Sequence, residues 1–418
     1  MKDAHEHDLR IKAIRLYDDG IGFNEILRRM QRSDFWLTKW LRRFREFGEE
    51  GLCDRSRVPK HVRNRTRGSL IRKILALRDE LAAHKTRRAA FAGIGAETIH
   101  YELHDRGVRH LPVISTIEKI LARAGKTKKV KVKRTPGGPP YPYVRARKMG
   151  DLQQTDLVGP RYLRGPRGIT RFYSFHTIDV IGQTVSASQF PDKQTISLCR
   201  HLVDSWRSMG LPRVAQMDNE MSASGGGRYR YSLSQVIRLH LLFGIHLVFI
   251  PKGEPGRNAT VESFNNTWQM RVLRHRCANL RAVRRCSDRF LEYYHVRKPS
   301  RSLTVADHGT RFPGVLRDQL WATLRHLPTG FTLDPYFDAR GHPALPIAKG
   351  LVSWVRKVDA HGCIEFNGAE YFIRRKLERQ YVVATLSTYH RRVFIKYEGK
   401  VIKTFPFPFV GKVVDPIA

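Results

Sequence analysis

The chain has 418 residues, and its most unusual property is its charge. It carries 76 Lys and Arg against 38 Asp and Glu, a formal net charge of +38 with a pI near 10.6. A content of 41% hydrophobic and 10% aromatic residues excludes a chain that is disordered overall. So basic a protein favours polyanionic partners, of which nucleic acid is the commonest. The alternative is a basic surface that is merely solvated.

The N-terminal stretch MKDAHEHDLRIK is charged and lacks the apolar segment of a signal peptide. The longest apolar run, residues 239–250, contains two histidines and is too short to span a membrane. Five cysteines are scattered without a CxxC pair, which argues against a disulfide framework and a cysteine-based zinc site. Such cysteines suit a reducing cytosol. We therefore expect a cytoplasmic, nucleoid-associated protein without a membrane partner.

Residues 1–62 are predicted to form a helix-turn-helix DNA-binding domain. Apolar spacing predicts one helix that ends at Asp19-Gly20, a short second helix, and a third capped by Ser33. A short helix, a tight turn and a longer basic helix make this motif, although a plain three-helix bundle is the alternative. The third helix is expected to bury Phe35, Trp36, Trp40, Leu41 and Phe44. The outward residues expected to reach a major groove are Thr38, Lys39, Arg42 and Arg43.

A second helix-turn-helix domain is predicted for residues 63–134. Its residues 93–125 indicate a helix, a turn and a Ser-capped helix, with Ile99, Leu103, Ile114, Ile117 and Ile120 inward. Two such domains in tandem imply a long bipartite DNA site. A basic run then precedes a Pro/Gly linker at residues 135–149, and it is either a solvated tail or a phosphate contact. Its basic residues are Lys126, Lys128, Lys129, Lys131, Lys133 and Arg134.

Residues 150–305 change to a pattern of strands and amphipathic helices. The order is three strands, helix, strand, helix, strand and helix, which predicts a mixed sheet with helices on both faces. A connector is expected at residues 306–345. Residues 346–418 then show five or six short strands with HG, NG and EG turns, which predicts a small β-barrel. The expected fold is therefore multidomain: α, then α/β, then β.

Three acids occupy distinctive places in the predicted α/β domain. Asp156 lies in the first strand, Asp218 follows the fourth, and Glu262 begins the helix after the fifth. If the first and fourth strands are neighbours, the two aspartates lie side by side, and the returning helix can bring Glu262 over them. Carboxylates so close repel one another unless cations neutralise them, and Mg²⁺ prefers such oxygen ligands. Each acid alone could instead be a turn residue or favour a helix dipole.

Residues 255–287 contain seven arginines, and Glu262 is their one acid. The arginines, Arg257 among them, are expected to hold DNA, while Glu262 would hold a metal ion. Two such ions about 4 Å apart can activate a nucleophile and stabilise a leaving oxygen in phosphoryl transfer.

Several motifs in fixed order resemble one family. The N-terminal segment ends in GLCDRSRVP, and QTDLVG, QMDNE, IPKGEPGRNATVESFNNTW and LEYYHVRKPSRSL follow in turn. Over roughly residues 8–305 the chain resembles insertion-sequence transposases of the retroviral-integrase superfamily, which have a DDE core of the ribonuclease H fold. Two features depart from the family pattern. Residues 219–261 make a long separation between Asp218 and Glu262, and Ala259-Thr260 stands where a glycine is common.

The resemblance implies that Asp156, Asp218 and Glu262 are catalytic and bind two Mg²⁺ ions per active site, with Mn²⁺ as a substitute. Asn219 and Glu220 would support the second aspartate. It further implies binding to terminal inverted repeats, cleavage of the 3′ ends, strand transfer into target DNA, and self-association into a dimer or larger on double-stranded DNA. The alternatives are a DNA-binding regulator, a catalytically inactive transposase-derived protein, or a structure-selective nuclease.

Overall fold

The computed structural model describes residues 2–55, 65–127, 138–166, 168–219, 231–337 and 344–418. The chain divides into two compact units, residues 1–67 and 68–418. Each unit is described by itself. Among the helices of the described residues, none has the length and apolar character that a membrane crossing needs.

The N-terminal unit contains three helices and a closing 3₁₀ turn. Ser33 caps the third helix, since its Oγ accepts the Trp36 N–H at 3.3 Å, as the sequence predicted. Leu37 and Trp40 are buried in the core. The expected burial of Phe35 is wrong: it is 75% exposed, because other residues of the same helix fill the inner face. The elements are α1 (Lys2–Asp18), α2 (Phe23–Met30), α3 (Asp34–Phe47) and η1 (Gly48–Leu52).

The second unit begins with three more helices, α4 (Gly68–Ala83), α5 (Ala96–Asp105) and α6 (Ile114–Arg123). They bury apolar residues such as Ile99 and Ile117, as expected from the spacing. The predicted serine cap of the last helix is wrong, because Val113 occupies the cap position and no side chain caps it.

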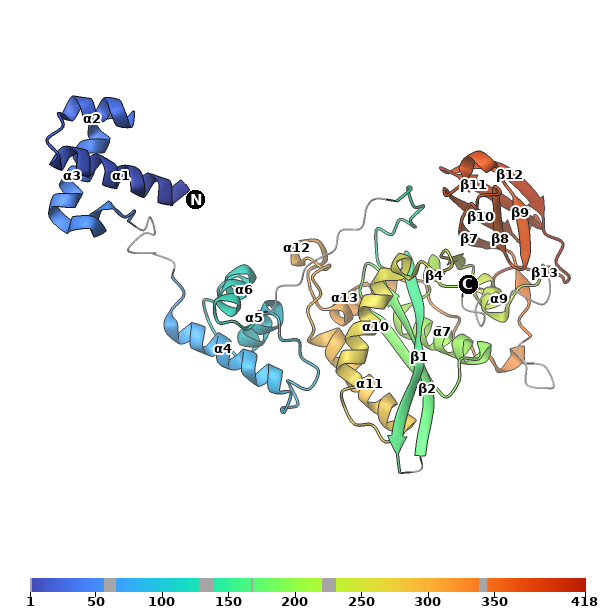
Figure 1. Cartoon of the computed structure of the whole chain (residues 1–418). Helices are drawn as coiled ribbons and strands as arrows, with labels where there is room; N and C mark the ends of the chain where they lie inside the picture. Colours follow the sequence, from blue (N-terminus) through green and yellow to red (C-terminus); the bar gives the residue numbers. More distant parts are fainter. Residues whose placement is uncertain (1, 56–64, 128–137, 167, 220–230, 338–343) are drawn as a thin grey trace. The chain divides into compact units, whose positions relative to one another are not determined.

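A mixed sheet follows, and it confirms the predicted α/β region. The strand order is β3-β2-β1-β4-β5. β1 and β2, which lie side by side in Figure 1, pair antiparallel, as do β2 and β3, whereas β1 with β4 and β4 with β5 pair in parallel. This is the strand order of a ribonuclease H-like core. The strands are β1 (Leu152–Gly165), β2 (Gly168–Asp179), β3 (Val185–Phe190), β4 (Val214–Met217) and β5 (His246–Phe249).

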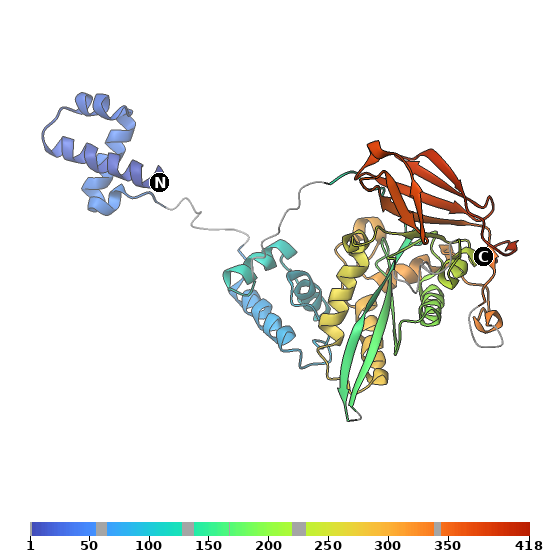
Figure 2. The ribbon, with the colours of Figure 1, turned by 45° about the vertical axis from the view of Figure 1, so that its right-hand side comes forward.

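Helices cover both faces of this sheet (Figure 2). On β2, Phe175 packs with α7 and α9, whereas Ile178 packs with α10 and α11. Residues three apart on a strand point to opposite faces, so the two helix pairs lie on opposite sides. The helices are α7 (Thr195–Met209), α9 (Gln235–Leu242), α10 (Ala259–Val272) and α11 (Leu280–Val296), followed by the shorter α12 (Val305–His308) and α13 (Pro313–Leu320).

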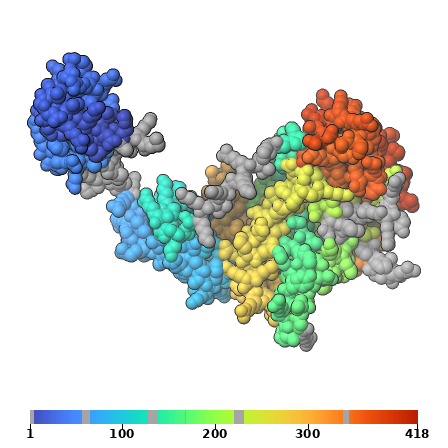
Figure 3. Space-filling model, in the orientation of Figure 1, coloured from blue at the N-terminus to red at the C-terminus, as the bar shows by residue number. Residues whose placement is uncertain are grey.

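The C-terminal strands extend the same sheet. β7 pairs in parallel with β5, through Leu247↔Val352 and Phe249↔Trp354, and β10, β11 and β12 continue outward to give nine strands. The separate small β-barrel predicted for residues 346–418 is therefore not confirmed. Figure 3 shows these residues, in orange and red, directly against the core. The strands are β6 (Ile347–Ala348), β7 (Leu351–Lys357), β8 (Cys363–Phe366), β9 (Ala369–Phe372), β10 (Tyr381–Ser387), β11 (Arg392–Tyr397), β12 (Lys400–Pro406) and β13 (Val413–Val414).

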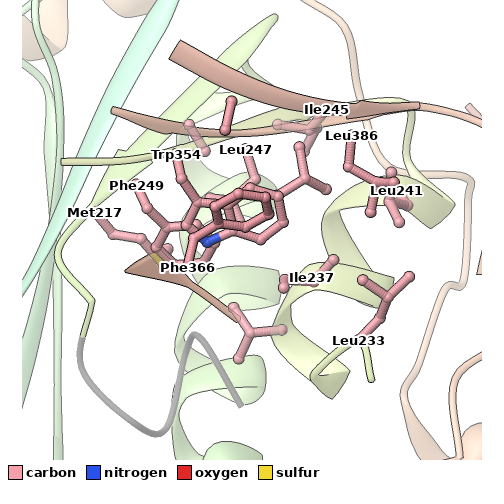
Figure 4. Packing of buried hydrophobic residues seen from close by; sticks show 14 of the residues in the cluster. Met217, Leu233, Ile237, Leu241, Ile245, Leu247, Phe249, Trp354, Phe366 and Leu386 are labelled. Atoms are coloured by element: carbon pink, nitrogen blue, oxygen red, sulfur yellow. The ribbon is translucent and has the colours of Figure 1, made fainter. Parts of the chain in front are cut away.

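One hydrophobic core joins the C-terminal strands to the α/β core. Trp354 of β7 is 1% exposed and stacks between Phe249 of β5 and Phe366 of β8, with ring centroids 5.8 Å and 5.2 Å away (Figure 4). Ile237 and Leu241 of α9 complete the same cluster. Because aromatic burial of this kind is a large part of the stability of a small domain, the strands are an integral part of this fold.

The described part of the predicted linker packs on the sheet. Tyr141, Val144 and Ala146 pack on a cluster that includes Val248 of β5 and Val355 of β7. This cluster lies on the face of the sheet opposite Phe249 and Trp354, since side chains alternate along a strand. The segment therefore covers apolar surface where β5 and β7 meet.

Candidate active site

The register of the sheet aligns the two predicted aspartates. Gln154 of β1 is the parallel partner of Gln216 of β4. Asp156 lies two residues after Gln154 in β1, and Asp218 lies two residues after Gln216, directly past the end of β4, so the register brings the two acids to the same end of this strand pair. The condition stated from the sequence, that these two strands are neighbours, is met.

The same two glutamines hold the beginning of α10. Gln154 Oε1 accepts the backbone N–H groups of Thr260 and Val261 at 3.1 Å and 3.2 Å. Gln216 Nε2 donates to the carbonyl of Arg257 at 2.9 Å. The two bonds to Gln154 satisfy free N–H groups at a helix start, which would otherwise need a cap.

Asn258 adds a further link, because its Nδ2 donates to the Thr155 carbonyl at 3.0 Å. Glu262 lies in the first turn of the helix so held. The predicted glutamate is therefore brought to the strand that carries Asp156.

The charges of the other two acids affect the pKa of Asp156. Burial, together with the smaller effect of the charges of Asp218 and Glu262, raises the pKa of Asp156 to about 6. Backbone and side-chain hydrogen bonds act in the opposite direction. A carboxyl group destabilised in this way by burial and by two like charges gains from a bound cation.

The donor set suits a hard divalent ion, since all three groups offer carboxylate oxygens. In the described ranges, however, no three His, Cys, Asp or Glu side chains gather closely enough to hold a metal ion as they stand. The three acids are thus neighbours whose side chains would have to converge on an ion.

Two residues of the C-terminal strands reach the segments that carry these acids. Arg356 of β7 donates to Asn219 Oδ1 at 2.6 Å, beside Asp218. The hydroxyl of Tyr381 in β10 donates its one hydrogen to the Glu254 carboxylate, whose oxygens lie 2.8 Å and 2.7 Å away, ahead of Glu262. The strands that were predicted to form a separate barrel therefore hold the segment beside Asp218 and the segment ahead of Glu262. The support of Asp218 expected of Asn219 stays a prediction, and Glu220 lies outside the described residues.

Arg257 sits in a cage of protein groups. Its guanidinium donates to Glu254 at 2.9 Å, to the Tyr143 hydroxyl at 2.9 Å and to the Tyr381 hydroxyl at 3.1 Å. It also lies 4.1 Å from the ring centroid of Tyr141. This arrangement ties the segment before Glu262 to residues 141–143 and to β10. The contact of Arg257 with DNA stays a prediction, and it would compete with these partners.

The residues of α3 that were predicted to bind DNA differ in exposure. Thr38 and Arg42 are exposed, whereas Lys39 and Arg43 are half-buried. Arg43 donates to the Cys53 carbonyl at 2.7 Å, and both half-buried cations lie over the Trp40 ring. Thr38 and Arg42 are therefore the more accessible of the four to a DNA groove.

In the basic run, the Lys126 ammonium is 2.7 Å from Asp79 Oδ1. The other predicted phosphate contacts lie outside the described residues; they are Lys128, Lys129, Lys131, Lys133 and Arg134.

The sequence interpretation missed the polar residues around the acids. Gln154 and Gln216 hold α10, and Asn265 of the same helix donates to Asp156 Oδ2 at 2.6 Å. One signal was available: each aspartate is preceded by glutamine at the second position, as QTD and QMD. Asn265 also follows Glu262 by three residues, and such residues share one helix face.

Comparison with known proteins gives two results. Residues 4–53 match the family of homeodomain-like domains, which agrees with the helix-turn-helix of the first unit. Among solved structures, the chain is similar to a simian T-cell lymphotropic virus intasome in complex with a PP2A regulatory subunit. The identity is 14% over 76% of this chain and 95% of that chain, with a TM-score of 0.33.

Two integrase catalytic cores also match. One is from HTLV-2, in complex with magnesium, at 15% identity over 38% of this chain and 96% of that chain, with a TM-score of 0.29. The other is from BIV, at 12% identity over 42% of this chain and 97% of that chain, with a TM-score of 0.30. Likenesses this distant carry no argument about the site. The fold assignment rests on the strand order.

Proposed function

We propose that this protein is a DNA transposase that cleaves the 3′ ends of a mobile element and joins them to target DNA. One observation carries the proposal: the sheet register aligns Asp156 with Asp218, and α10, pinned to the same strands, adds Glu262. Its support includes the homeodomain-like match, the net charge of +38 and the motif order.

The three carboxylates would hold divalent metal ions, Mg²⁺ or Mn²⁺, two per site. Such ions would activate the attacking oxygen and stabilise the leaving oxygen of an in-line displacement. The protein itself supplies the geometry: Asp156 lies in β1, Asp218 directly follows β4, and Gln154 and Asn258 fix the approach of the helix that bears Glu262. Sites on strands and pinned helices hold their groups more accurately than sites on loops.

DNA binding would be shared between the helix-turn-helix of the first unit, the second helical region and the basic run at residues 126–134. The affinity should fall steeply with salt, since a protein of this charge binds by releasing counterions. Two element ends must be joined in one reaction, so we propose a dimer or larger on DNA.

The test uses the full chain with duplexes taken from the DNA that flanks its coding region and with a plasmid target. Nicked ends and joined products are expected with Mg²⁺ or Mn²⁺, whereas Ca²⁺ should permit binding with little chemistry. If the protein binds these ends but never cuts them with any of the ions, the regulator alternative replaces the transposase.

A further inference from the structure

A chain of buried hydrogen bonds leads away from Asp156 into the core. Asn265 Nδ2 donates to Asp156 Oδ2 at 2.6 Å, and Asn265 Oδ1 lies 2.6 Å from His176 Nδ1. His176 Nε2 lies 2.8 Å from Ser174 Oγ, which accepts from Gln189 Nε2 at 3.0 Å. His176 and Ser174 are both completely buried. These hydrogen bonds are therefore shielded from water.

The donors of this chain can be assigned at each step. The Asn265 oxygen can only accept, so His176 Nδ1 must carry the proton. Burial lowers the pKa of His176 to about 4, so the ring is neutral near pH 7 and its Nε2 is an acceptor. The Ser174 hydroxyl then donates to Nε2. Every bond thus points its hydrogen toward Asp156, and aligned bonds of this kind reinforce one another.

The position of His176 indicates that this row of hydrogen bonds does more than fill the core. His176 is the antiparallel partner of Asp156 across β1 and β2, so the two side chains share one face. Without a donor on His176, the Asn265 amide could rotate and turn its oxygen toward the Asp156 carboxylate. The two oxygens would repel each other, and the carboxylate would lose its fixed orientation.

We infer that His176 is a positioning residue for the proposed metal site, an inference that rests on the proposed function. It fixes the amide orientation of Asn265, which in turn holds Asp156 Oδ2. The other carboxylate oxygen is then left for a divalent cation. Groups behind metal ligands commonly change metal affinity by 10–100-fold when they are removed.

The experiment measures Mn²⁺ binding to the full chain by isothermal titration calorimetry. The specific site is the binding that Asp156→Asn abolishes. His176→Leu should weaken that binding about 10–100-fold. His176→Asn should restore it to within about 3-fold, because its side-chain amide nitrogen stands near the place of Nδ1 and can donate to Asn265.

His201→Leu is the matched control. His201 is also completely buried and also bonded to hydroxyls, with Thr177 Oγ1 and Ser188 Oγ both at 2.9 Å. It should lose stability while keeping the Mn²⁺ affinity of the wild type. If both leucine variants weaken binding equally, or if His176→Leu binds as well as the wild type, the inference is wrong.

Ser174→Ala covers the case in which His176→Leu does not fold. It removes the donor to Nε2 with little change of volume, and it should weaken Mn²⁺ binding in the same direction. Unchanged affinity in Ser174→Ala, with His176→Leu unfolded, would also overturn the inference. A wild type that binds no Mn²⁺ contradicts the proposed metal site itself, so the two failures are distinguishable.

Discussion

The two ends of the chain differ in how they relate to the α/β core. The N-terminal unit has its own core, built around Leu37 and Trp40, and it separates from the rest as a compact body. The C-terminal strands share theirs with the α/β core, through Trp354 and the β5–β7 pairing. The sequence indicated a separate domain at both ends, yet only the first behaves as one. Whether a segment forms its own domain depends on where its apolar side chains are buried. The local pattern of a strand does not show this.

Removing each end should therefore have opposite results. Deletion of residues 346–418 leaves β5 as an unpaired edge and uncovers Phe249, so we expect an insoluble or unfolded core. Deletion of residues 1–67 should leave the melting of the remainder unchanged. Circular dichroism melting of both truncations checks this. A chain ending at residue 345 that melts at the same temperature as the full-length protein would show that the C-terminal strands are not an integral part of the fold.

Trp354→Ala should be the most damaging single change in the C-terminal strands. The side chain is 1% exposed, and removing it leaves a cavity between Phe249 and Phe366. We expect a loss of about 3–5 kcal/mol in the free energy of unfolding, measured by urea denaturation. Phe372→Ala, on the 51% exposed ring of β9, is the control and should lose less than about 1 kcal/mol. Equal losses of unfolding free energy in the two variants would contradict a hydrophobic core shared by the C-terminal strands and the α/β core.

Arg356→Met tests whether the C-terminal strands also support the site. Without the guanidinium, the Asn219 Oδ1 and the Ile250 carbonyl lose a donor. We expect a loss of about 1–3 kcal/mol in stability, with DNA cleavage falling more than DNA binding. Arg375→Met, an exposed position in the same region, should change neither. If Arg356→Met cleaves DNA normally at a temperature where it is folded, the C-terminal strands contribute packing and do not support the site.

The smallest effects should come from helix caps. Ser33→Ala removes the cap of α3, and Ser234→Ala removes the cap of α9, where Ser234 Oγ accepts the Ile237 N–H at 3.1 Å. Each change should cost about 1 kcal/mol. Ser33→Ala should lower only the melting transition of the first unit, and Ser234→Ala only that of the second. Calorimetry that shows both variants shifting one common transition would contradict two independent units.

Local features of the fold could be predicted from the sequence because their causes lie within a few residues. Ser33 caps its helix, and the Asn367-Gly368 and Glu398-Gly399 turns close hairpins with both residues at positive φ. The β5–β7 pairing could not be predicted in this way, since a strand pattern does not name its partner. One sign was present: Val352 to Val355 are buried on both faces, as in the interior of a sheet.

In the candidate site, too, some residues could be predicted from the sequence and others could not. Asp156 and Asp218 stand out by their places in and after a strand, and Glu262 as the one acid in a segment of seven arginines. The groups that align them are ordinary polar residues, such as Gln154 and His176, whose roles depend on register across the sheet. Such roles become visible only when the strands are paired.

The most direct test of the account compares Glu262→Gln with Glu292→Gln, an exposed glutamate of α11 in the same unit. Both variants are assayed for binding and for 3′-end cleavage of the flanking DNA with Mg²⁺. Glutamine keeps the shape of Glu262 but removes the charge that a divalent ion needs. Glu262→Gln should bind DNA as the wild type does and fail to cleave it, whereas Glu292→Gln should do both. Cleavage by Glu262→Gln at the wild-type rate would contradict the three-carboxylate site.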